Sequence, residues 1–347
     1  MSGASRISVV IPCHDGLPDV LEAVASVLAQ TAPPHEIVIV DDASSDGSAQ
    51  ALEQRFGERV RFVRGRFGSA SAARNAGWRA AVGEWIAFLD ADDLWFPDKL
   101  AVAAERLTAA PKADWFFSDG AFRTLDGQWH ASWFGLYADL VEPYVGSPVA
   151  QLFEVNFVLT SSTIVRRSAL EAVGGFDEAL THAEDLDLWI RLSRAGLATG
   201  SRRALVRYQH REGGLTQQTV KRLEGGWILF SRLAADPALA PGLRRRARRR
   251  ASLYAYKLAL HALRGGQGGA AREHFARAWM VPERVVPVLL GFAATLLPAA
   301  LFQRMRGRSG AVALATPMVA VRRVVLRGDD DPGASEVGAN GRAGERS

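Results

Sequence analysis

Apolar and polar residues follow one another along the first hundred positions in a pattern that predicts strands separated by helices. The predicted strands are short, continuous apolar runs of the kind found in strands buried on both faces: Ile7–Ile11, Glu36–Val40, Val60–Val63 and Trp85–Leu89. The predicted helices between them have apolar residues at helical spacing or are rich in alanine: Leu17–Gln30, Ser48–Phe56 and Ser69–Val82. Strands separated by helices pair in parallel through right-handed crossovers, so this half is predicted to be an open α/β sheet.

The pattern becomes less regular after residue 100. The predicted strands there are Trp115–Ser118, Thr163–Arg166 and Ala204–Tyr208, with a polar hairpin or loop over Arg123–Trp133. Ser168–Val173 and Leu186–Ala195 are predicted helices. From Thr216 onward the pattern is helical, with segments at Thr219–Ala235, Leu243–Arg264 and Gly269–Trp279. A helical extension over residues 216–280 is therefore expected after the sheet.

Residues 281–327 form an apolar segment rich in arginine. Val285–Phe302 carries no charge over 18 residues, which is close to the shortest length that spans a bilayer, and two prolines interrupt it. Three readings stay open: a helix pair at or half inserted into an anionic membrane surface, a helix packed on the domain or on a partner, and a transmembrane span. The tail, residues 328–347, is rich in Gly, Asp, Glu and Ala and is predicted to be disordered.

Composition narrows the class of protein and its partners. The chain has 347 residues, 48% of them hydrophobic, and a net charge of +5 that comes almost entirely from arginine. Basicity alone is compatible with nucleic acid, an anionic membrane or a phosphorylated substrate. The dense acidic motifs described below would repel a phosphodiester backbone, so no nucleic acid partner is expected.

Cysteine usage and the N-terminus bear on the compartment. Cys13 is the only cysteine, which excludes an intrachain disulfide and fits a reducing compartment. Its place beside an apolar strand predicts a small buried thiol. The first six residues, MSGASR, run directly into that strand without the apolar segment of a secretory signal. A cytoplasmic location is expected.

Acidic residues follow the carboxyl ends of two predicted strands, at the sheet edge where open α/β folds bind ligands. Asp41 and Asp42 come at the end of the second strand, where a carboxylate can accept hydrogen bonds from a base or a ribose. Asp90 and Asp92 follow the fourth strand and, on an extended segment, would face one point with Ala91 turned away. Two carboxylates suit Mg²⁺ or Mn²⁺ and leave positions free for phosphate oxygens and water. The sequence therefore predicts a divalent metal site that carries a diphosphate.

Further candidate residues lie elsewhere along the chain. Arg74, in the helix before the fourth strand, could donate to a base, ribose or phosphate, although an isolated arginine is usually a surface residue. Glu184 and Asp185 precede a predicted helix, where acids are favoured by the positive helix end. One of them would be a general base for an attacking hydroxyl. His210 follows a strand and would reach the metal or the diphosphate, its plainer reading being a surface histidine.

Six segments, in this order, resemble a family 2 glycosyltransferase: ISVVIPCHD, EIVIVDDASSDGS, SAARNAGW, GEWIAFLDADDLWFPDKL, VGGFDE and AEDLDLWIRL. The resemblance covers about residues 6–215 and implies a GT-A fold, with residues 1–100 as the nucleotide-binding half and 101–215 as the acceptor half. It implies an inverting, metal-dependent enzyme that moves a hexose-type sugar from a nucleoside diphosphate donor to a hydroxyl of a glycan or glycolipid. Cell envelope polysaccharide synthesis at the inner face of the plasma membrane would suit such an enzyme.

The resemblance also implies roles for single residues. On the nucleotide side it places Pro12, His14, Asp15, Asp41, Asp42, Arg74, Asp90 and Ala91, with Asp42 at the base and Asp90 near the ribose. Asp92 would be the main metal ligand and Asp185 the general base. YQHREGGLT resembles a later His-Pro-Gly-Ser loop, which makes His210 a secondary metal candidate, although Arg211 and Glu212 replace the usual proline. His14 and Asp15 replace the usual Tyr-Asn pair, so an imidazole would take the place of an aromatic ring beneath the base.

Two other functions compete with the transferase. A nucleotidyltransferase of sugar-nucleotide synthesis needs a glycine-rich triphosphate loop with a basic residue after the first strand, and PCHDGLPD supplies none. An inactive membrane-associated scaffold would have no need to keep Asp42, Asp92 and Asp185. The transferase is therefore the preferred hypothesis.

Overall fold

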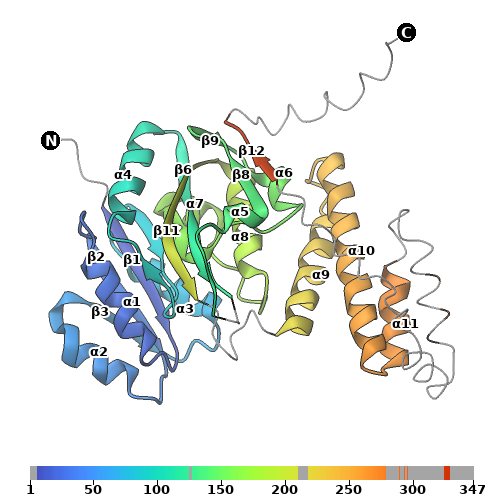
Figure 1. Cartoon of the computed structure of the whole chain (residues 1–347), viewed down its shortest axis with the longest axis horizontal. Helices are drawn as coiled ribbons and strands as arrows, with labels where there is room; N and C mark the ends of the chain where they lie inside the picture. The colour runs from blue at the N-terminus through green and yellow to red at the C-terminus, as the bar shows by residue number, and fades with distance from the viewer. Residues whose placement is uncertain are drawn as a thin grey trace, which may run out of the picture. The chain divides into compact units, whose positions relative to one another are not determined.

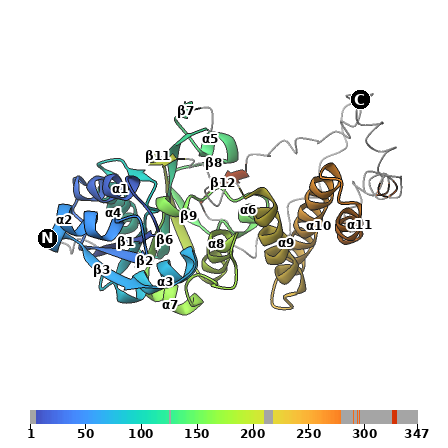
Figure 2. The same cartoon turned by 90° about the horizontal axis from the view of Figure 1, so that it is seen from below.

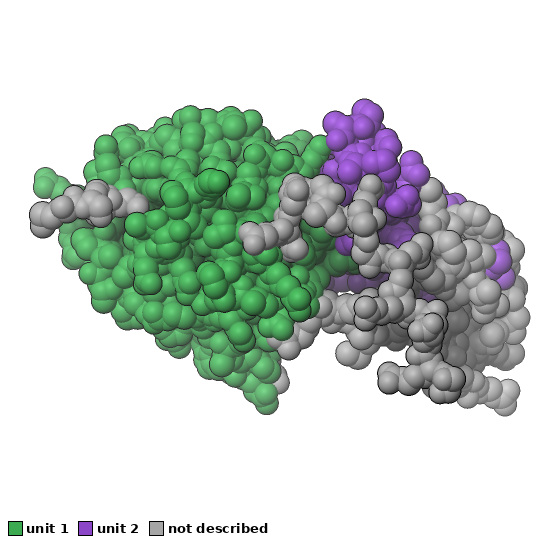
Figure 3. Space-filling view, turned by 90° about the horizontal axis from the view of Figure 1, so that it is seen from above, with its two compact units in different colours: residues 1–179, 184–211, 323–347 green, residues 180–183, 212–322 purple. Residues whose placement is uncertain are grey.

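The protein is represented by a computed structural model, which describes residues 6–124, 127–209, 218–278, 289, 293, 295 and 324–328. The chain divides into two compact units, coloured separately in Figure 3. The first contains residues 1–179, 184–211 and 323–347, and the second contains residues 180–183 and 212–322. All the strands of the large sheet belong to the first unit.

The first unit is built on a sheet with the strand order β3-β2-β1-β4-β10-β6-β11-β5. The four strands of the first hundred residues pair in parallel: β1 (Ile7–Cys13), β2 (Glu36–Asp42), β3 (Arg61–Gly65) and β4 (Trp85–Phe88). The helices between them are α1 (Asp19–Leu28), α2 (Ser48–Phe56) and α3 (Ala70–Ala80) (Figure 1). The predicted order of strands and helices is confirmed. The third strand begins after Val60 rather than at it, because Gly57–Arg59 forms a 3₁₀ turn that Val60 closes with a hydrogen bond to Gly57.

The rest of the sheet is mixed in direction. Strand β10 (Ile164–Arg166) runs antiparallel to β4 and to β6 (Ala113–Arg123), and β11 (Leu197–Gln209) runs parallel to β6. Short strands complete it: β5 (Leu94–Trp95) and β9 (Tyr144–Gly146) pair with β11, and β7 (Trp129–His130) pairs with β6 as the predicted hairpin. The three strands predicted here are confirmed, and two of them are considerably longer than predicted. Their extensions carry aromatic or polar residues that interrupt the apolar runs.

Several short elements surround this second half. They are α4 (Lys99–Ala109), α5 (Phe134–Tyr137), β8 (Ala138–Leu140), α6 (Val149–Leu152), η2 (Thr160–Ser162), α7 (Arg167–Val173), α8 (Glu184–Ala195) and β12 (Val324–Leu326). Strand β12 pairs with β8, which joins a segment near the end of the chain to the first unit. Helix α8 begins at Glu184, two residues before the predicted start, so both candidate acids lie in its first turn.

Helices cover both faces of the sheet. Figure 2 shows α1 and α4 on one face and α3 and α7 on the other. Alternate residues of β1 point to opposite faces: Val9 and Ile11 belong to the core under α1 and α4, whereas Val10 faces α3. Gly77 of α3 allows that approach, because a Cβ there would lie 2.4 Å from Val10 Cγ1. The predicted mainly parallel α/β sheet flanked by helices is confirmed.

The second unit is helical. Its helices are α9 (Thr219–Ala235), α10 (Pro241–Arg264) and α11 (Gly268–Arg277), close to the three predicted segments. Alanines and aromatic rings form its core, with Tyr256 and Phe275 at a centroid distance of 5.9 Å. No helix within the described part of the chain is both long and apolar enough to cross a membrane. Most of residues 281–323 and all of residues 329–347 lie outside the described part, so the predictions for the apolar segment and for the tail stay predictions.

Candidate active site

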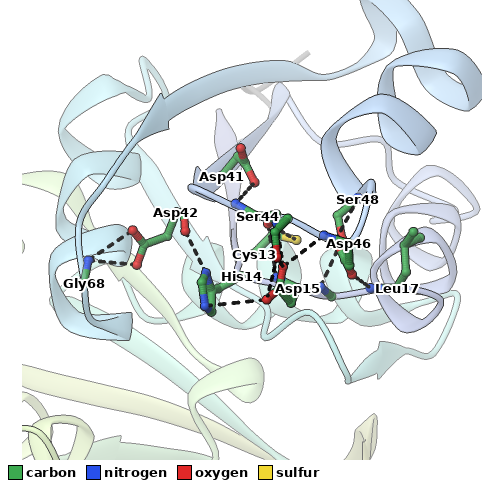
Figure 4. Close-up of polar contacts among 12 residues, drawn as sticks. Cys13, His14, Asp15, Leu17, Asp41, Asp42, Ser44, Asp46, Ser48 and Gly68 are labelled. Carbon is green, nitrogen blue, oxygen red and sulfur yellow. Dashed lines mark hydrogen bonds and ion pairs between the residues drawn. The ribbon is translucent and has the colours of Figure 1, made fainter.

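Strand register brings the first two acidic residues to the carboxyl edge of the sheet. Asp41 pairs with Cys13 of β1 and Asp42 with Gly65 of β3, so the three strands end nearly level. Both aspartates occupy the last positions of β2 rather than following it, and both are buried. Asp42 accepts hydrogen bonds from the backbone N–H groups of Phe67 and Gly68 (Figure 4). The Asp42 carboxylate therefore fixes the loop that leads into α3.

The turn after β1 lies against this strand end. Pro12 is the penultimate residue of β1, and His14 Nδ1 lies 2.7 Å from the Asp42 carbonyl oxygen. The His14 side chain is nevertheless 64% exposed. Asp15 accepts hydrogen bonds from the N–H groups of Ser45 and Asp46, and these bonds lower the pKa of Asp15. Two loops at the sheet edge are thus tied together (Figure 4).

The predicted buried thiol is confirmed. Cys13 is 2% exposed, and its burial raises the pKa of the thiol. Its Sγ lies 4.0 Å from Ser44 Oγ, beneath the turn shown in Figure 4. Cys13 is therefore a packing residue, and it contacts the loop after β2 that contains Ser44.

The segment from Asp90 to Asp93 is a turn, which corrects the extended conformation that was expected. The N–H of Asp93 donates to the Asp90 carbonyl at 3.1 Å, because the chain must reverse between β4 and β5. Ala91 is partly buried and packs against the core. Asp90 and Asp92 are both half-buried. Their carboxylates are therefore presented by a turn rather than by strand alternation.

A buried support holds this turn, and it was not predicted. Ser161 Oγ accepts the N–H of Asp90 at 3.0 Å and donates to the Asp93 carboxylate at 2.5 Å. Gln209 donates from its backbone N–H to Asp93 and from its side chain to the Asp92 carbonyl. Burial, followed by the charges of Asp92 and Asp90, raises the pKa of Asp93. Asp93 therefore anchors the turn, and its burial is the main cause of its raised pKa.

Arg74 joins the turn to the first turn of α8. Its guanidinium donates to Asp90 Oδ1 at 2.7 Å and to Glu184 Oε1 at 3.3 Å, and it lies over the ring of Phe176. Arg74 is 6% exposed, so the surface position that is usual for arginine does not apply. Burial disfavours its charge, but Asp90 and Glu184 outweigh that effect and raise the pKa of Arg74. Residues 74, 90 and 184 therefore form one ionic network around the buried Arg74 side chain.

The two acids of α8 have different partners. Burial and the neighbouring Asp185 charge raise the pKa of Glu184 to about 7, against the attraction of Arg74. Burial also raises the pKa of Asp185, whereas the N–H of Leu186 and the side-chain amide of Asn156 favour its ionised form. Those two donors lie 2.7 Å and 2.8 Å from the Asp185 oxygens. The Asp185 carboxylate is therefore held in a fixed direction by neutral donors, as a general base requires.

The carboxylates fit a divalent cation that takes part of its ligands from a substrate. Asp90 and Asp92 offer hard oxygens from one turn, and Asp90 gives one oxygen to Arg74. Among the described residues, no three His, Cys, Asp or Glu side chains form a ready-made ion site. Such a donor set suits Mg²⁺ or Mn²⁺, which are often held by one or two carboxylates together with phosphate oxygens and water.

The structure brings together most of the residues singled out in the sequence, in two clusters on one sheet edge. His14, Asp15, Asp41 and Asp42 lie at the ends of β1 and β2, and Arg74, Asp90, Asp92, Glu184 and Asp185 lie beyond β4. His210 lies outside the described residues. Asn156, Ser161 and Gln209 were missed, because they lie in segments without a recognisable motif.

Comparison with known proteins decides the family. The model of the family described as Glycosyl transferase family 2 matches residues 8–174. A relative named succinoglycan biosynthesis protein ExoO, from Rhizobium meliloti, is 33% identical over 244 residues, which are 67% of this chain and 67% of that protein. The chain belongs to glycosyl transferase family 2. The predicted family is thereby confirmed. Other curated relatives are longer, and the chain spans 38% and 30% of the length of two of them.

Solved structures agree on the fold. TarS 1–349 from S. aureus, in complex with UDP-GlcNAc, has a TM-score of 0.61 at 17% identity over 87% of this chain and 92% of that one. The mannosyltransferase PcManGT from Pyrobaculum calidifontis, in complex with GDP-Man and Mn²⁺, has a TM-score of 0.57 at 21% identity over 91% and 82% of the two chains. At these identities the likeness bears on the fold alone. This family 2 chain has the predicted GT-A fold.

Proposed function

We propose that the chain is an inverting glycosyltransferase that moves a sugar from a nucleoside diphosphate donor to a hydroxyl of a glycan or glycolipid. One observation carries the proposal: residues far apart in the sequence gather at one sheet edge, where Arg74 bridges Asp90 and Glu184 beside Asp185. Family membership supports the reaction class. The complexes of TarS with UDP-GlcNAc and of PcManGT with GDP-Man support the donor class.

The ends of β1 and β2 are assigned to the base and ribose. The exposed ring of His14 is suited to stack beneath a base, and the fixed Asp42 carboxylate and the Phe67–Gly68 loop lie next to it. Asp15 and Asp41 accept hydrogen bonds from the loop after β2, and Pro12, next to the last residue of β1, would line the same nucleotide side. Arg74, which binds Asp90, would orient that carboxylate toward the ribose and the diphosphate.

The turn after β4 is assigned to the metal and the diphosphate. Asp92, with Asp90, would hold Mn²⁺ or Mg²⁺, and His210 is a secondary candidate. When bound, the cation would neutralise charge on the departing diphosphate. The Mn²⁺ complex of PcManGT supports the choice of ion. Ala91, between these two aspartates, packs against the core and would lie next to the nucleotide-sugar.

Asp185 is assigned as the general base. The acceptor hydroxyl would give its proton to the Asp185 carboxylate while its oxygen forms a bond to the anomeric carbon. The bond from that carbon to the diphosphate oxygen breaks, and its electron pair leaves with the diphosphate. A single in-line displacement inverts the configuration. Glu184, held by Arg74, would keep the base in position and contribute to its electrostatic environment.

The acceptor and the location are the broadest parts of the proposal. Relatives named for succinoglycan and O-antigen biosynthesis support a glycan or glycolipid acceptor in cell envelope polysaccharide synthesis. We place the reaction in the cytoplasm at the inner face of the plasma membrane, with residues 1–215 as the catalytic part and residues 216–280 as the helical extension. Residues 281–327 would supply any attachment to the membrane.

The metal role can be tested by replacing Asp92. With radiolabelled UDP-GlcNAc and GDP-mannose as donors, wild type is expected to release labelled sugar in the presence of Mn²⁺. Asp92→Ala is expected to lower that rate by about a hundredfold or more, because the charge on the leaving group is no longer neutralised. Asp114→Ala serves as the control, because it removes a carboxylate at the amino end of β6, away from the sheet edge that carries the acidic turn. Equal rates in wild type and Asp92→Ala would refute the metal role.

A further inference from the structure

An exposed tryptophan and an exposed arginine pair on the outer part of the sheet, outside the catalytic network. Trp129 of β7 is 44% exposed, and the guanidinium carbon of Arg207 lies 4.8 Å from its ring centroid. The neighbouring Arg123 is exposed as well. Neither arginine takes part in an ion pair with a described residue. The cation–π contact keeps the Arg207 guanidinium against the indole while both groups stay accessible to a ligand.

Strand register places this pair at the same sheet edge as the acidic turn. Gln209 pairs with Arg123, and Arg123 pairs with Trp129, so β6 alone separates β11 from β7. Neighbouring strands are about 4.8 Å apart, which puts Trp129 on the order of 10 Å from Gln209 across the sheet. Gln209 is the residue whose N–H binds Asp93. Trp129 and Arg207 are therefore within one or two sugar lengths of the proposed centre.

The pair also faces the same side as the turn. Residues 207 and 209 alternate with 208, so Arg207 shares its face with the Gln209 side chain that donates to the Asp92 carbonyl. The opposite face carries aromatic contacts, with Phe122 stacked on His130 and Trp133 edge to face with Tyr208. One face is therefore packed, and the face that carries Trp129 and Arg207 is open to solvent. Figure 2 shows β7 projecting from the first unit.

The side chains of Trp129 and Arg207 indicate which class of ligand could bind there. An exposed indole gives a flat apolar surface on which a sugar ring can stack. A guanidinium binds a carboxylate or a phosphate with two parallel hydrogen bonds, and its contact with the indole pre-orients it. The catalytic turn is strongly acidic and would repel an anionic acceptor, so cationic groups are needed farther out to hold one.

On the basis of the proposed function, we propose that Trp129 and Arg207, with Arg123 beside them, form an acceptor subsite for an acidic sugar residue. Trp129 takes the sugar ring, and Arg207 takes its carboxylate or phosphate. The subsite holds the acceptor chain one or two residues away from the hydroxyl that is glycosylated. It thereby sets a preference for anionic glycans over neutral ones.

The test is binding of short glycans to the full chain, measured by calorimetry at low ionic strength. The probes are pentagalacturonate, which carries carboxylates, a phosphorylated mannopentaose, which carries phosphate, and neutral maltopentaose. Wild type is expected to bind at least one acidic probe about tenfold or more tightly than the neutral one. The acidic probe that binds identifies the anionic group. Equal affinity for all three probes, or binding of neither acidic probe, would overturn the proposal.

Substitutions separate the two parts of the subsite. Arg207→Gln should reduce the affinity for the acidic probe to that of the neutral one, whereas Trp129→Ala should weaken both and Trp129→Phe should restore most of the loss. Arg55→Gln is the matched control, because Arg55 also lies over an aromatic ring, that of Phe56, but on α2. If Arg207→Gln binds like Arg55→Gln, the assignment is wrong.

Donor chemistry is measured separately in the same variants. Mn²⁺-dependent donor hydrolysis should be unchanged in Arg207→Gln and Trp129→Ala, because neither residue belongs to the acidic network. If wild type itself shows no Mn²⁺-dependent donor hydrolysis, the result counts against the proposed function. Intact hydrolysis without a preference for acidic glycans would count against the subsite alone.

Discussion

Two neighbouring carboxylates at the start of α8 differ because of what surrounds them. Glu184 is bound to a buried arginine, whereas Asp185 is held by the Leu186 N–H and the Asn156 amide. A carboxylate that is aimed by neutral donors keeps an oxygen able to accept a proton. The assignment of Asp185 as the base therefore depends on its contacts as well as on its place in the motif.

Asp185→Asn tests that assignment without changing the shape of the side chain. The amide cannot accept the proton of the acceptor hydroxyl, so transfer should fall by about 10²- to 10⁴-fold. Donor affinity, measured by calorimetry with Mn²⁺, should change little, because the base contacts the acceptor. Transfer within a few-fold of wild type would show that the proton goes elsewhere.

Lys99 gives a prediction that concerns stability. It is fully buried, its ammonium group donates to the Ser162 carbonyl at 2.9 Å, and burial lowers its pKa to about 7. Between that value and its usual 10.5, the unfolded chain binds a proton that the folded chain does not. Stability should therefore rise with pH across this window, by at most about 1.4 kcal/mol per pH unit.

Urea unfolding of wild type and Lys99→Met at pH 7 and pH 9.5 checks this effect. Wild type should gain stability relative to the variant as the pH rises, because methionine does not titrate. Lys112→Met, at an exposed lysine, controls for the loss of a positive charge. A difference between wild type and Lys99→Met that is the same at both pH values would contradict the prediction.

Among single residues, those that lie in recognisable motifs can be predicted from the sequence, whereas those that only support them cannot. Asp42, Asp92 and Asp185 could be identified because each follows or begins an element with a clear pattern. Ser161 and Asn156 could not, since their partners lie 68 and 29 residues away along the chain. Side-chain support of this kind depends on tertiary packing, which no local pattern encodes.

Among the elements, the loop between α7 and α8 shows how a short motif acts through shape. Asn75 of α3 binds this loop through the Phe176 N–H and carbonyl, and Phe176 in turn lies under Arg74. Gly175 has a φ of +75°, and a Cβ there would lie 2.5 Å from Asn75 Oδ1. The Gly-Gly-Phe-Asp-Glu motif is therefore needed for close approach of the loop to α3.

The two glycines of this loop form a matched pair of test sites. Gly174 also has a positive φ, +82°, but nothing lies within 4 Å of its added Cβ. Gly174→Ala should cost about 1 kcal/mol of unfolding free energy through backbone strain alone. Gly175→Ala should cost about 2 kcal/mol more, because it adds overlap with Asn75 and Trp78. Equal destabilisation in urea unfolding would show that the contact with Asn75 is not important.

Element prediction succeeded where periodicity was strong and failed where the chain turns or pairs at long range. The helix Thr219–Ala235 is found with its predicted bounds. The segment Asp90–Asp93 was expected to be extended and is a turn, because two strands of opposite direction follow each other there. The pairing of β12 with β8 was not predicted, since three residues do not specify a partner almost two hundred residues away.

In the molecule as a whole, the strand order determines which residues meet. Parallel pairing of β3, β2, β1 and β4 brings their carboxyl ends to one edge, so the alternation of strands and helices was enough to predict that the acidic residues at those ends meet there. The insertion of the antiparallel β10 between β4 and β6 could not be read from its apolar run. That insertion places η2, and with it Ser161, behind the acidic turn.

The central claim is that these carboxylates share one cation and one diphosphate. Anomalous diffraction from crystals of the full chain grown with Mn²⁺ and a nucleoside diphosphate tests it most directly. A manganese peak is expected within about 2.5 Å of an Asp92 carboxylate oxygen and of a diphosphate oxygen, on the same side of the sheet as Asp185. A manganese and diphosphate pair bound away from the Asp90–Asp93 turn would contradict the account.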